Sequence, residues 1–173
     1  MRFTTFYNKA GNAWCDFYTL KFSQEDPNLM ENFEHVKESV ARITKILDKE
    51  VEEIGDSQKC FMGGFSSGGF IAAVTWKGFR KPLAGLILHS GKAGKVIPVA
   101  PEQEFSPIFW THGVDDVLFK YRHGVWNNSN LNTGKRKFVH FTRGGLGHAI
   151  DRVIQLKARR FIQDVMSNPQ PKL

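Results

Sequence analysis

The fold of this protein is decided by residues 59–69, which read KCFMGGFSSGG. Residues 59–65 form a short apolar run that predicts a buried strand. Small residues follow it, and then comes a second apolar stretch, residues 70–76, which fits a helix or a strand by pattern alone. A buried strand at this position predicts that the neighbouring elements pack around it as layers.

Helices and strands alternate along the rest of the chain. Apolar residues spaced four and three apart predict a long amphipathic helix over residues 28–54. Asp26 and Pro27 suit its start, and Gly55 suits its end. Further strands are predicted over residues 83–88, 107–112 and 137–142, and a last helix from about residue 148 to 166. Apolar strands separated by helices are typical of a mostly parallel sheet flanked by helices on both faces.

The composition is that of a globular protein with a large core. The chain has 173 residues, of which 41% are hydrophobic and 24% charged. These values predict a single α/β domain over residues 1–173. No run approaches 18 apolar residues, and no continuous apolar segment follows Met1, so we expect neither a spanning helix nor a secretory signal. Cys15 and Cys60 cannot form a disulfide framework and lack metal-site spacing, which favours a reducing, cytoplasmic compartment.

The charge is basic but scattered. A formal net charge of +7 permits contact with nucleic acid or transient contact with an anionic membrane surface. The densest groups, such as residues 135–137, form neither a long block nor a basic helical arm. A solvated basic surface is therefore the favoured interpretation, and we do not expect a nucleic-acid partner.

The first candidate site follows the strand at residues 59–65. Residues 64–68 have the pattern G-x-S-x-G centred on Ser66. In a nucleophile elbow the chain turns sharply from strand to helix, and a side chain on either flanking glycine would clash. A helix that starts at Ser67 would direct its first backbone N–H groups toward a developing oxyanion. The alternative is an ordinary glycine-serine turn.

An acid and a base follow two later strands. Asp115 and Asp116 come after the strand at residues 107–112, where a carboxylate could hold a histidine in the correct tautomer. His148 comes after the last strand and a loop of three glycines, at the start of the final helix. The order serine, acid, histidine is that of α/β-hydrolases, whereas chymotrypsin-like and subtilisin-like enzymes use other orders. We therefore expect Ser66, Asp116 and His148 to converge on one edge of the sheet.

The chain resembles the acyl-protein thioesterase family, also called the phospholipase/carboxylesterase family, over nearly its whole length. Residues 61–69 resemble the family's G-G-F-S-Q-G-G elbow, and residues 83–88 resemble the L-A-G strand that follows it. Residues 107–116 resemble its P-I-x-x-x-H-G-x-x-D segment. Residues 147–148 resemble its second glycine-histidine site, and residues 14–16 resemble its W-F-D motif.

This resemblance implies an α/β-hydrolase fold and hydrolysis of acyl thioesters or carboxylic esters, with no metal or cofactor. Ser66 would attack the acyl carbonyl, His148 would take up and return the proton, and Asp116 would orient His148. The backbone N–H of Ser67 would donate to the oxyanion. The substrates would be S-acylated proteins, lysophospholipids or small esters. We also expect an apolar acyl groove beside Ser66, lined partly by aromatic residues, and activity that rises as His148 loses its proton.

Three departures from the family pattern support an alternative to an active hydrolase. Ser67 stands where the family has glutamine, and Val117 stands where it has proline, so Asp115 competes with Asp116 for the role of the acid. The family also has an N-terminal region with early strands and an H-G-x-G-type loop that supplies a second oxyanion donor, which we expect this chain to lack. Loss of one such donor costs on the order of 10²–10³ in turnover. The alternative is therefore a truncated or inactive hydrolase-like binding protein.

Overall fold

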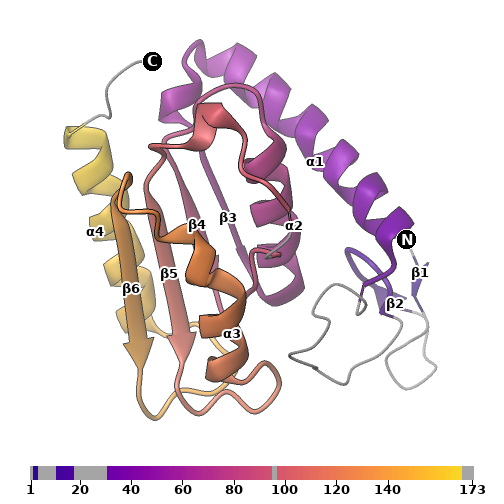
Figure 1. The fold of residues 1–173 in the computed structure, drawn as a ribbon, viewed down its shortest axis with the longest axis vertical. Coiled ribbons are helices and arrows are strands. Elements are labelled where there is room, and N and C mark those ends of the chain that lie inside the picture. The colour runs from indigo at the N-terminus through magenta and orange to yellow at the C-terminus, as the bar shows by residue number, and fades with distance from the viewer. Residues whose placement is uncertain (1, 4–10, 18–30, 95–96, 169–173) are drawn as a thin grey trace.

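A parallel sheet of four strands forms the centre of the protein. The computed structural model describes residues 2–3, 11–17, 31–94 and 97–168. The strands lie in the spatial order β3 (Phe61–Phe65), β4 (Gly85–His89), β5 (Ile108–Gly113) and β6 (Phe138–Arg143). Each neighbouring pair is parallel. All four carboxyl ends therefore lie at one edge of the sheet, the lower edge in Figure 1, and the predicted mostly parallel sheet is confirmed.

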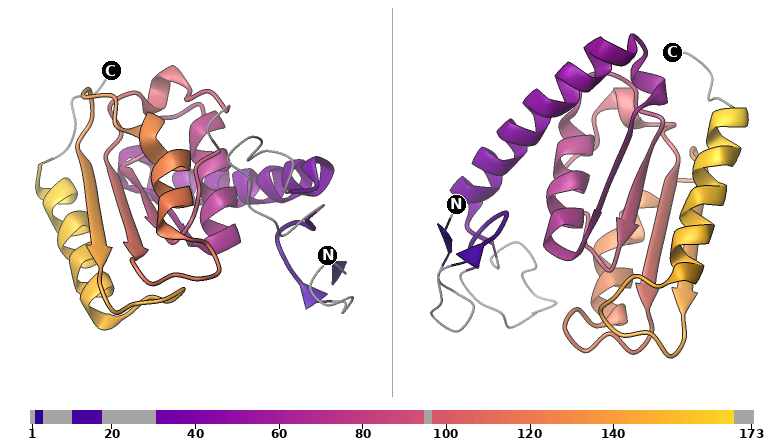
Figure 2. Two further views of the ribbon diagram at one scale, coloured as in Figure 1. Left: turned by 60° about the horizontal axis from the view of Figure 1, so that its bottom comes forward. Right: turned by 180° about the vertical axis from the view of Figure 1, so that it is seen from behind.

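Helices cover both faces of this sheet. One face carries α2 (Ser66–Gly78) and α3 (Tyr121–Asn128), with α1 (Phe33–Ile54) packed outside α2. The opposite face carries α4 (Arg152–Ser167), as Figure 2 shows from behind. Residues 70–76, which by pattern fitted either a helix or a strand, are helical. This double cover explains why every residue of β5 and all but the last of β4 are buried, because both faces of a sheet between helices are covered.

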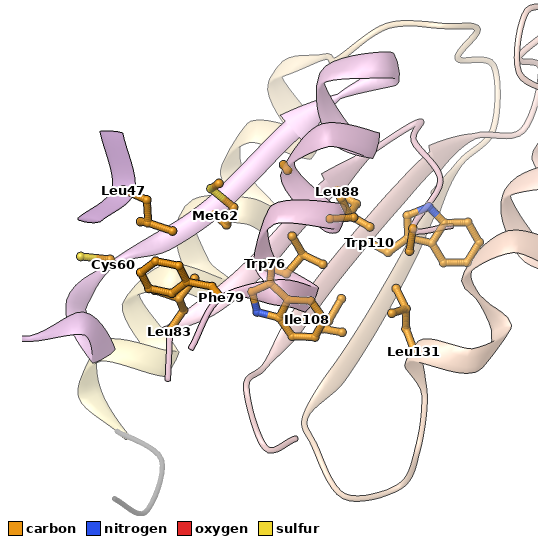
Figure 3. Packing of buried hydrophobic residues seen from close by; sticks show 14 of the residues in the cluster. Leu47, Cys60, Met62, Trp76, Phe79, Leu83, Leu88, Ile108, Trp110 and Leu131 are labelled. Atoms are coloured by element: carbon orange, nitrogen blue, oxygen red, sulfur yellow. The ribbon is translucent and has the colours of Figure 1, made fainter. Parts of the chain in front are cut away.

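The main core lies between the sheet and the helices α1 and α2. Trp76 of α2 and Leu88 and Ile108 of the sheet are each completely buried there (Figure 3). A smaller cluster on the other face packs Phe161 and Val165 of α4 against Phe109 of β5. Phe161 and Val165 therefore face the core. Bulky side chains on both faces hold the strands, and with them the loops at the carboxyl edge, in fixed positions.

The long first helix begins later than the sequence predicts. Asn32 is its N-cap, and the side-chain oxygen of Asn32 accepts hydrogen bonds from the backbone N–H groups of Glu34 and His35. Glu31 pairs with Phe17 in an isolated β-bridge, so an unbroken helix from residue 28 is wrong. The predicted cap at residues 26–27 lies outside the described residues. The end at Gly55 is confirmed, because this glycine has a φ of 75° and its N–H donates to the carbonyl of Val51.

Other differences lie where the sequence pattern is weak. The last helix begins at Arg152 and not at residue 148, because Asp151 is its N-cap and accepts from the backbone N–H of Ile154. The short α3 was not predicted, since its glycine and asparagines are poor helix formers. The two-residue strands β1 (Arg2–Phe3) and β2 (Gly11–Asn12) were also not predicted. Within the described ranges, no helix is long and apolar enough to cross a membrane.

The segment at residues 11–17 is attached to the main body beside α2. Cys15 is buried in an apolar cluster between α1 and α2, and burial raises the pKa of its thiol to about 12. A buried ion pair joins Glu31 to Lys92 of the loop after β4, at 2.8 Å. These contacts fix the neighbouring Trp14 at the N-terminal end of α2, where its indole nitrogen faces the backbone of the first turn.

Candidate active site

Ser66 stands at a sharp turn between β3 and α2. The strand ends at Phe65 and the helix starts at Ser66, which has a φ of 55°. This left-handed conformation is uncommon for a residue with a side chain and is strained. A Cβ on Gly64 would lie 2.5 Å from the backbone of Gly68, and a Cβ on Gly68 would lie 3.0 Å from the indole nitrogen of Trp14. The close approach therefore requires glycine at position 64 and leaves little room at position 68.

The structure brings together the three residues that the sequence selected. The Nε2 atom of His148 lies 2.8 Å from the Oγ atom of Ser66. The Nδ1 atom of His148 lies 2.7 Å from the Oδ2 atom of Asp116. Each residue follows a different strand, β3, β5 or β6, at the shared carboxyl edge. In the neutral imidazole, Nδ1–H donates to the carboxylate and Nε2 can accept the serine proton, which is the arrangement that general-base catalysis needs.

Asp116 is held rigidly by its own loop. Its side chain is fully buried. The Oδ1 atom accepts hydrogen bonds from the backbone N–H groups of Leu118 at 3.0 Å and Phe119 at 2.8 Å. The Oδ2 atom is thereby directed toward His148, and it also lies 3.3 Å from Nε2 of His112. A carboxylate that accepts several hydrogen bonds is fixed in orientation.

Asp115, the competing acid, has a different set of contacts. Its exposed carboxylate accepts a hydrogen bond from the backbone N–H of Gly145 at 2.7 Å. Its own backbone N–H donates to the carbonyl of Leu146 at 3.0 Å. Asp115 therefore ties the loop after β5 to the loop after β6. It holds the segment that carries His148, while Asp116 contacts the ring itself.

His148 lies in a loop and not in a helix. The loop over residues 144–151 precedes α4 and contains three glycines. The imidazole packs on the ring of Phe65, with the ring centres 4.7 Å apart. Its side chain is 13% exposed, whereas the side chain of Asp116, which it contacts, is fully buried. The prediction that His148 begins the last helix is wrong, because Asp151 caps that helix three residues later.

The oxyanion donor predicted from the sequence lies at the start of α2. Ser67 is the second residue of this helix. The first backbone N–H groups of a helix have no partner inside the helix and carry a partial positive charge. The N–H of Ser67 is therefore suited to a negative oxygen that develops next to Ser66. Among the described residues, the N–H of Ser67 is the oxyanion donor that the sequence predicts.

Three residues beside the site were not assigned a role from the sequence. Phe65 and Trp14 place aromatic surfaces next to His148 and the first turn of α2. His112 was noticed only as part of a motif, although it lies behind Asp116. A signal for Phe65 existed, since it is the variable position of the elbow pattern. The position of Trp14 depends on contacts across more than fifty residues and could not be inferred from its neighbours in the sequence.

His89 also lies at the carboxyl edge but has a different environment. It pairs with Phe65 across the β3–β4 register, and its Nδ1 atom lies 2.6 Å from the Oγ1 atom of Thr111. Burial lowers the pKa of His89 to about 4. This histidine is therefore neutral at the pH where the site would work, and it contributes no positive charge near the serine.

A second concave surface lies at the other end of the molecule. A shallow open pocket of about 600 Å³ lies between α1 and the turn that precedes β3. Its polar lining consists of three carboxylates, one lysine and one serine: Asp48, Glu52, Asp56, Lys81 and Ser57. Ser57 donates its hydroxyl to the carbonyl of Pro82, so it is not paired with a base. The arrangement needed for nucleophilic chemistry is found at the carboxyl edge.

Comparison with solved structures identifies the fold. Arabidopsis thaliana SOBER1 superposes with a TM-score of 0.82 at 23% identity, covering 95% of this chain and 79% of that one. Zea mays acyl-protein thioesterase 2 superposes with a TM-score of 0.76 at 20% identity, covering 95% of this chain and 77% of that one. The predicted α/β-hydrolase fold is confirmed by this similarity.

Sequence comparison identifies the family. A probable carboxylesterase of Oryza sativa is 25% identical over 92% of this chain and 60% of its own length. Acyl-protein thioesterase 1 of Neurospora crassa is 25% identical over 93% of this chain and 66% of its own length. The chain thus spans about two thirds or less of the length of these relatives. The sequence profile of the phospholipase/carboxylesterase family matches residues 2–166. With this match over almost the whole sequence, the chain belongs to the phospholipase/carboxylesterase family.

Proposed function

We propose that this protein is a serine hydrolase that cleaves acyl thioesters or carboxylic esters through an acyl-enzyme on Ser66. The observation that carries the proposal is the continuous hydrogen-bonded chain from Ser66 through His148 to the buried Asp116. The strained φ of Ser66 supports it, because strain of this kind is concentrated at functional sites. Carboxylesterase and thioesterase activities among the named relatives agree with the same chemistry.

The mechanism follows from the positions of the donors and acceptors. Nε2 of His148 accepts the hydroxyl proton as Oγ of Ser66 attacks the acyl carbonyl carbon. The carbonyl oxygen becomes an anion that accepts from the N–H of Ser67 at the positive end of α2. His148 then donates its proton to the leaving thiol or alcohol as the acyl-enzyme forms. Water, deprotonated by the same imidazole, attacks the acyl-enzyme and releases a carboxylic acid and free Ser66.

The substrate class is proposed from the surfaces around the serine. Phe65 and Trp14 offer apolar faces beside Ser66 that suit an acyl chain. Val117 and Leu118, 79% and 63% exposed, stand on the loop that carries the acid. Together with a net charge of +7, these exposed apolar side chains support contact with an anionic membrane surface. S-acylated proteins, lysophospholipids and small esters are the substrates that we propose.

The cysteines support a proposal about the cellular compartment. The folded core supports a proposal about the limits of the domain. Cys15 and Cys60 are both free and buried, which supports a reducing, cytoplasmic compartment. We also propose that residues 1–173 act as a single domain, since the helices on both faces share one sheet.

The proposal is tested by turnover of matched substrates. A thioester and an oxygen ester with the same short acyl chain should both be hydrolysed by the wild-type protein, with a burst of leaving group that equals the enzyme concentration if deacylation is slow. Ser66→Ala should abolish both activities, whereas the neighbouring control Ser67→Ala keeps its backbone donor and should retain most of them. A folded wild-type protein that hydrolyses neither substrate, yet binds acylated peptides, would favour the binding-protein alternative.

A further inference from the structure

A completely buried histidine lies behind the aspartate. His112 is in β5, one residue before the strand ends, and its side chain has no exposed surface. Its Nε2 atom lies 2.7 Å from the carbonyl oxygen of Phe119 and 3.3 Å from Oδ2 of Asp116. Asp116 is thus located between two imidazoles, with His148 on the serine side and His112 on the core side.

The contacts of His112 determine which nitrogen carries the proton. A carbonyl oxygen only accepts, so Nε2 must be the donor, and one N–H is shared between Phe119 and Asp116. The Nδ1 atom is buried without a hydrogen-bond partner and faces α3, where a Cβ on Gly124 would come within 2.8 Å. Protonation of Nδ1 would bury an unpaired N–H group. Burial correspondingly lowers the pKa of His112. The ring is therefore neutral and donates a hydrogen bond through Nε2 alone.

A packing role alone does not explain this residue. A phenylalanine would fill similar space among the rings of Trp110, Phe119 and Tyr121 without an unsatisfied nitrogen. A buried polar atom without a partner costs stability, so its presence needs a reason. The contacts of His112 explain why a histidine stands here, because its Nε2–H donates to the loop that carries Asp116.

We infer that His112 is a positioning residue that holds Oδ2 of Asp116 toward Nδ1 of His148. This inference rests on the proposed function of the site. The N–H of Phe119 binds Oδ1 of Asp116, while the carbonyl of Phe119 and Oδ2 of Asp116 share the N–H of His112. The loop is thereby closed into a ring of hydrogen bonds that leaves the carboxylate one orientation. His112 touches neither substrate nor serine, so it acts only through Asp116.

The other titratable groups near His112 are few. Asp116 and His148 lie on the side of the site, and their charges act on His112 in opposite directions. His140 of β6 is stacked on Trp110, with ring centres 3.9 Å apart. His140 is therefore a matched control: it is a histidine packed on the same tryptophan, without a hydrogen bond to the loop.

The first experiment compares variants that remove or keep the donor. His112→Phe removes it at similar volume, His112→Asn withdraws it from the Nε2 position, and His112→Gln places an amide N–H near that position. We expect kcat to fall about 10-fold or more in the first two variants, with KM changed less than about twofold, because the effect acts on the aligned triad. His112→Gln should recover most of the loss, and His140→Phe should have wild-type kcat. The inference would be overturned if His112→Phe or His112→Asn had the wild-type kcat. It would also be overturned if His112→Gln lost as much kcat as those two variants.

A second measurement separates positioning from general damage to the fold. In the Asp116→Asn background, His112→Phe should cause less than about a twofold further loss in kcat, because a residue that acts through Asp116 has nothing left to position. The same tenfold loss in both backgrounds would contradict the inference.

A third measurement does not depend on turnover. The Nδ1–H proton of His148, which donates to Asp116, should give a low-field NMR resonance in the wild type, and this resonance should move upfield or disappear in His112→Phe, because a displaced carboxylate accepts a weaker hydrogen bond. An unchanged resonance would mean that the carboxylate stayed in place without His112 and would overturn the inference. If the wild type hydrolyses no ester or thioester, the proposed function fails, and this resonance still decides whether His112 positions Asp116.

Discussion

The loops that carry the acid and the base are held in different ways. The acid loop, residues 114–120, has two buried anchors, Asp116 and Phe119, and hydrogen bonds within itself. None of residues 144–151, the base loop, is buried. The base loop is attached mainly to the acid loop, through the backbone and carboxylate of Asp115 and through the bond from Asp116 to His148.

This difference indicates that the acid loop positions both Asp116 and His148. Changes in the acid loop should displace His148 as well as Asp116. A change at Gly144 of the base loop should have little effect, because a Cβ there would meet no atom within 4 Å. The following predictions use this difference, from the largest expected effect on turnover to the smallest.

Asp116→Asn should have the largest effect. The amide keeps the shape of the side chain and an acceptor for Leu118 and Phe119, but it presents no negative charge to His148. We expect kcat to fall about 10³–10⁴-fold, as when the acid of a serine triad is replaced by its amide. The matched control is Asp115→Asn, which should lose less than about tenfold. Steady-state kinetics of the two variants decide the assignment, and a larger loss in Asp115→Asn would reverse it.

Gly113→Ala should have the next largest effect. A Cβ at position 113 would clash with the backbone oxygens of Leu146 and Gly147 and so push the base loop away from the acid loop. A displacement of about 1 Å at a catalytic group can cost about 100-fold in rate. Gly144→Ala is the control, because a Cβ there would meet no atom within 4 Å. Equal kcat values for the two alanine variants would refute the idea that the loops must touch.

Asp115→Ala should have a smaller effect on turnover, although it weakens the same contact between the acid loop and the base loop. Its carboxylate is exposed and accepts a single backbone N–H, from Gly145, so we expect a loss in kcat of about 3- to 10-fold with KM unchanged. Asp115→Asn retains an acceptor oxygen and should lie between Asp115→Ala and the wild type. An Asp115→Ala protein as active as the wild type would show that the bonds made by the backbone are sufficient to hold the base loop.

His89→Asn should leave turnover at pH 7.5 unchanged and should alter acid stability. The folded protein keeps His89 neutral down to about pH 4, while an unfolded histidine takes up a proton near pH 6.5. The wild type should therefore lose stability as the pH falls from about 6.5 to about 4, by no more than about 2–3 kcal/mol from this group. Urea unfolding at pH 5 and pH 7.5 should show a smaller decrease for the variant. An identical decrease would show that His89 is not the group responsible.

The sequence predicted the strands and the three site residues because those depend on local patterns and on chain order. Ser66, Asp116 and His148 were each selected by the strand that precedes them. The sequence favoured Asp116 but left Asp115 as a competitor, because the decision depends on which carboxylate reaches a ring 32 residues further along the chain. The start of the last helix was misplaced because Asp151, and not His148, supplies the cap. The role of His112 depends on a contact with the backbone of Phe119, which no spacing pattern encodes.

The most direct test of the central claim is the covalent labelling of Ser66. A fluorophosphonate should add one adduct to the wild-type protein, and peptide mass mapping should locate it on Ser66. Ser66→Ala should take up no label, Ser67→Ala should label like the wild type, and His148→Ala should label about 100-fold more slowly or less. A folded wild-type protein that takes up no label, or an adduct that persists in Ser66→Ala, would contradict the claim that Ser66 is a nucleophile activated by His148.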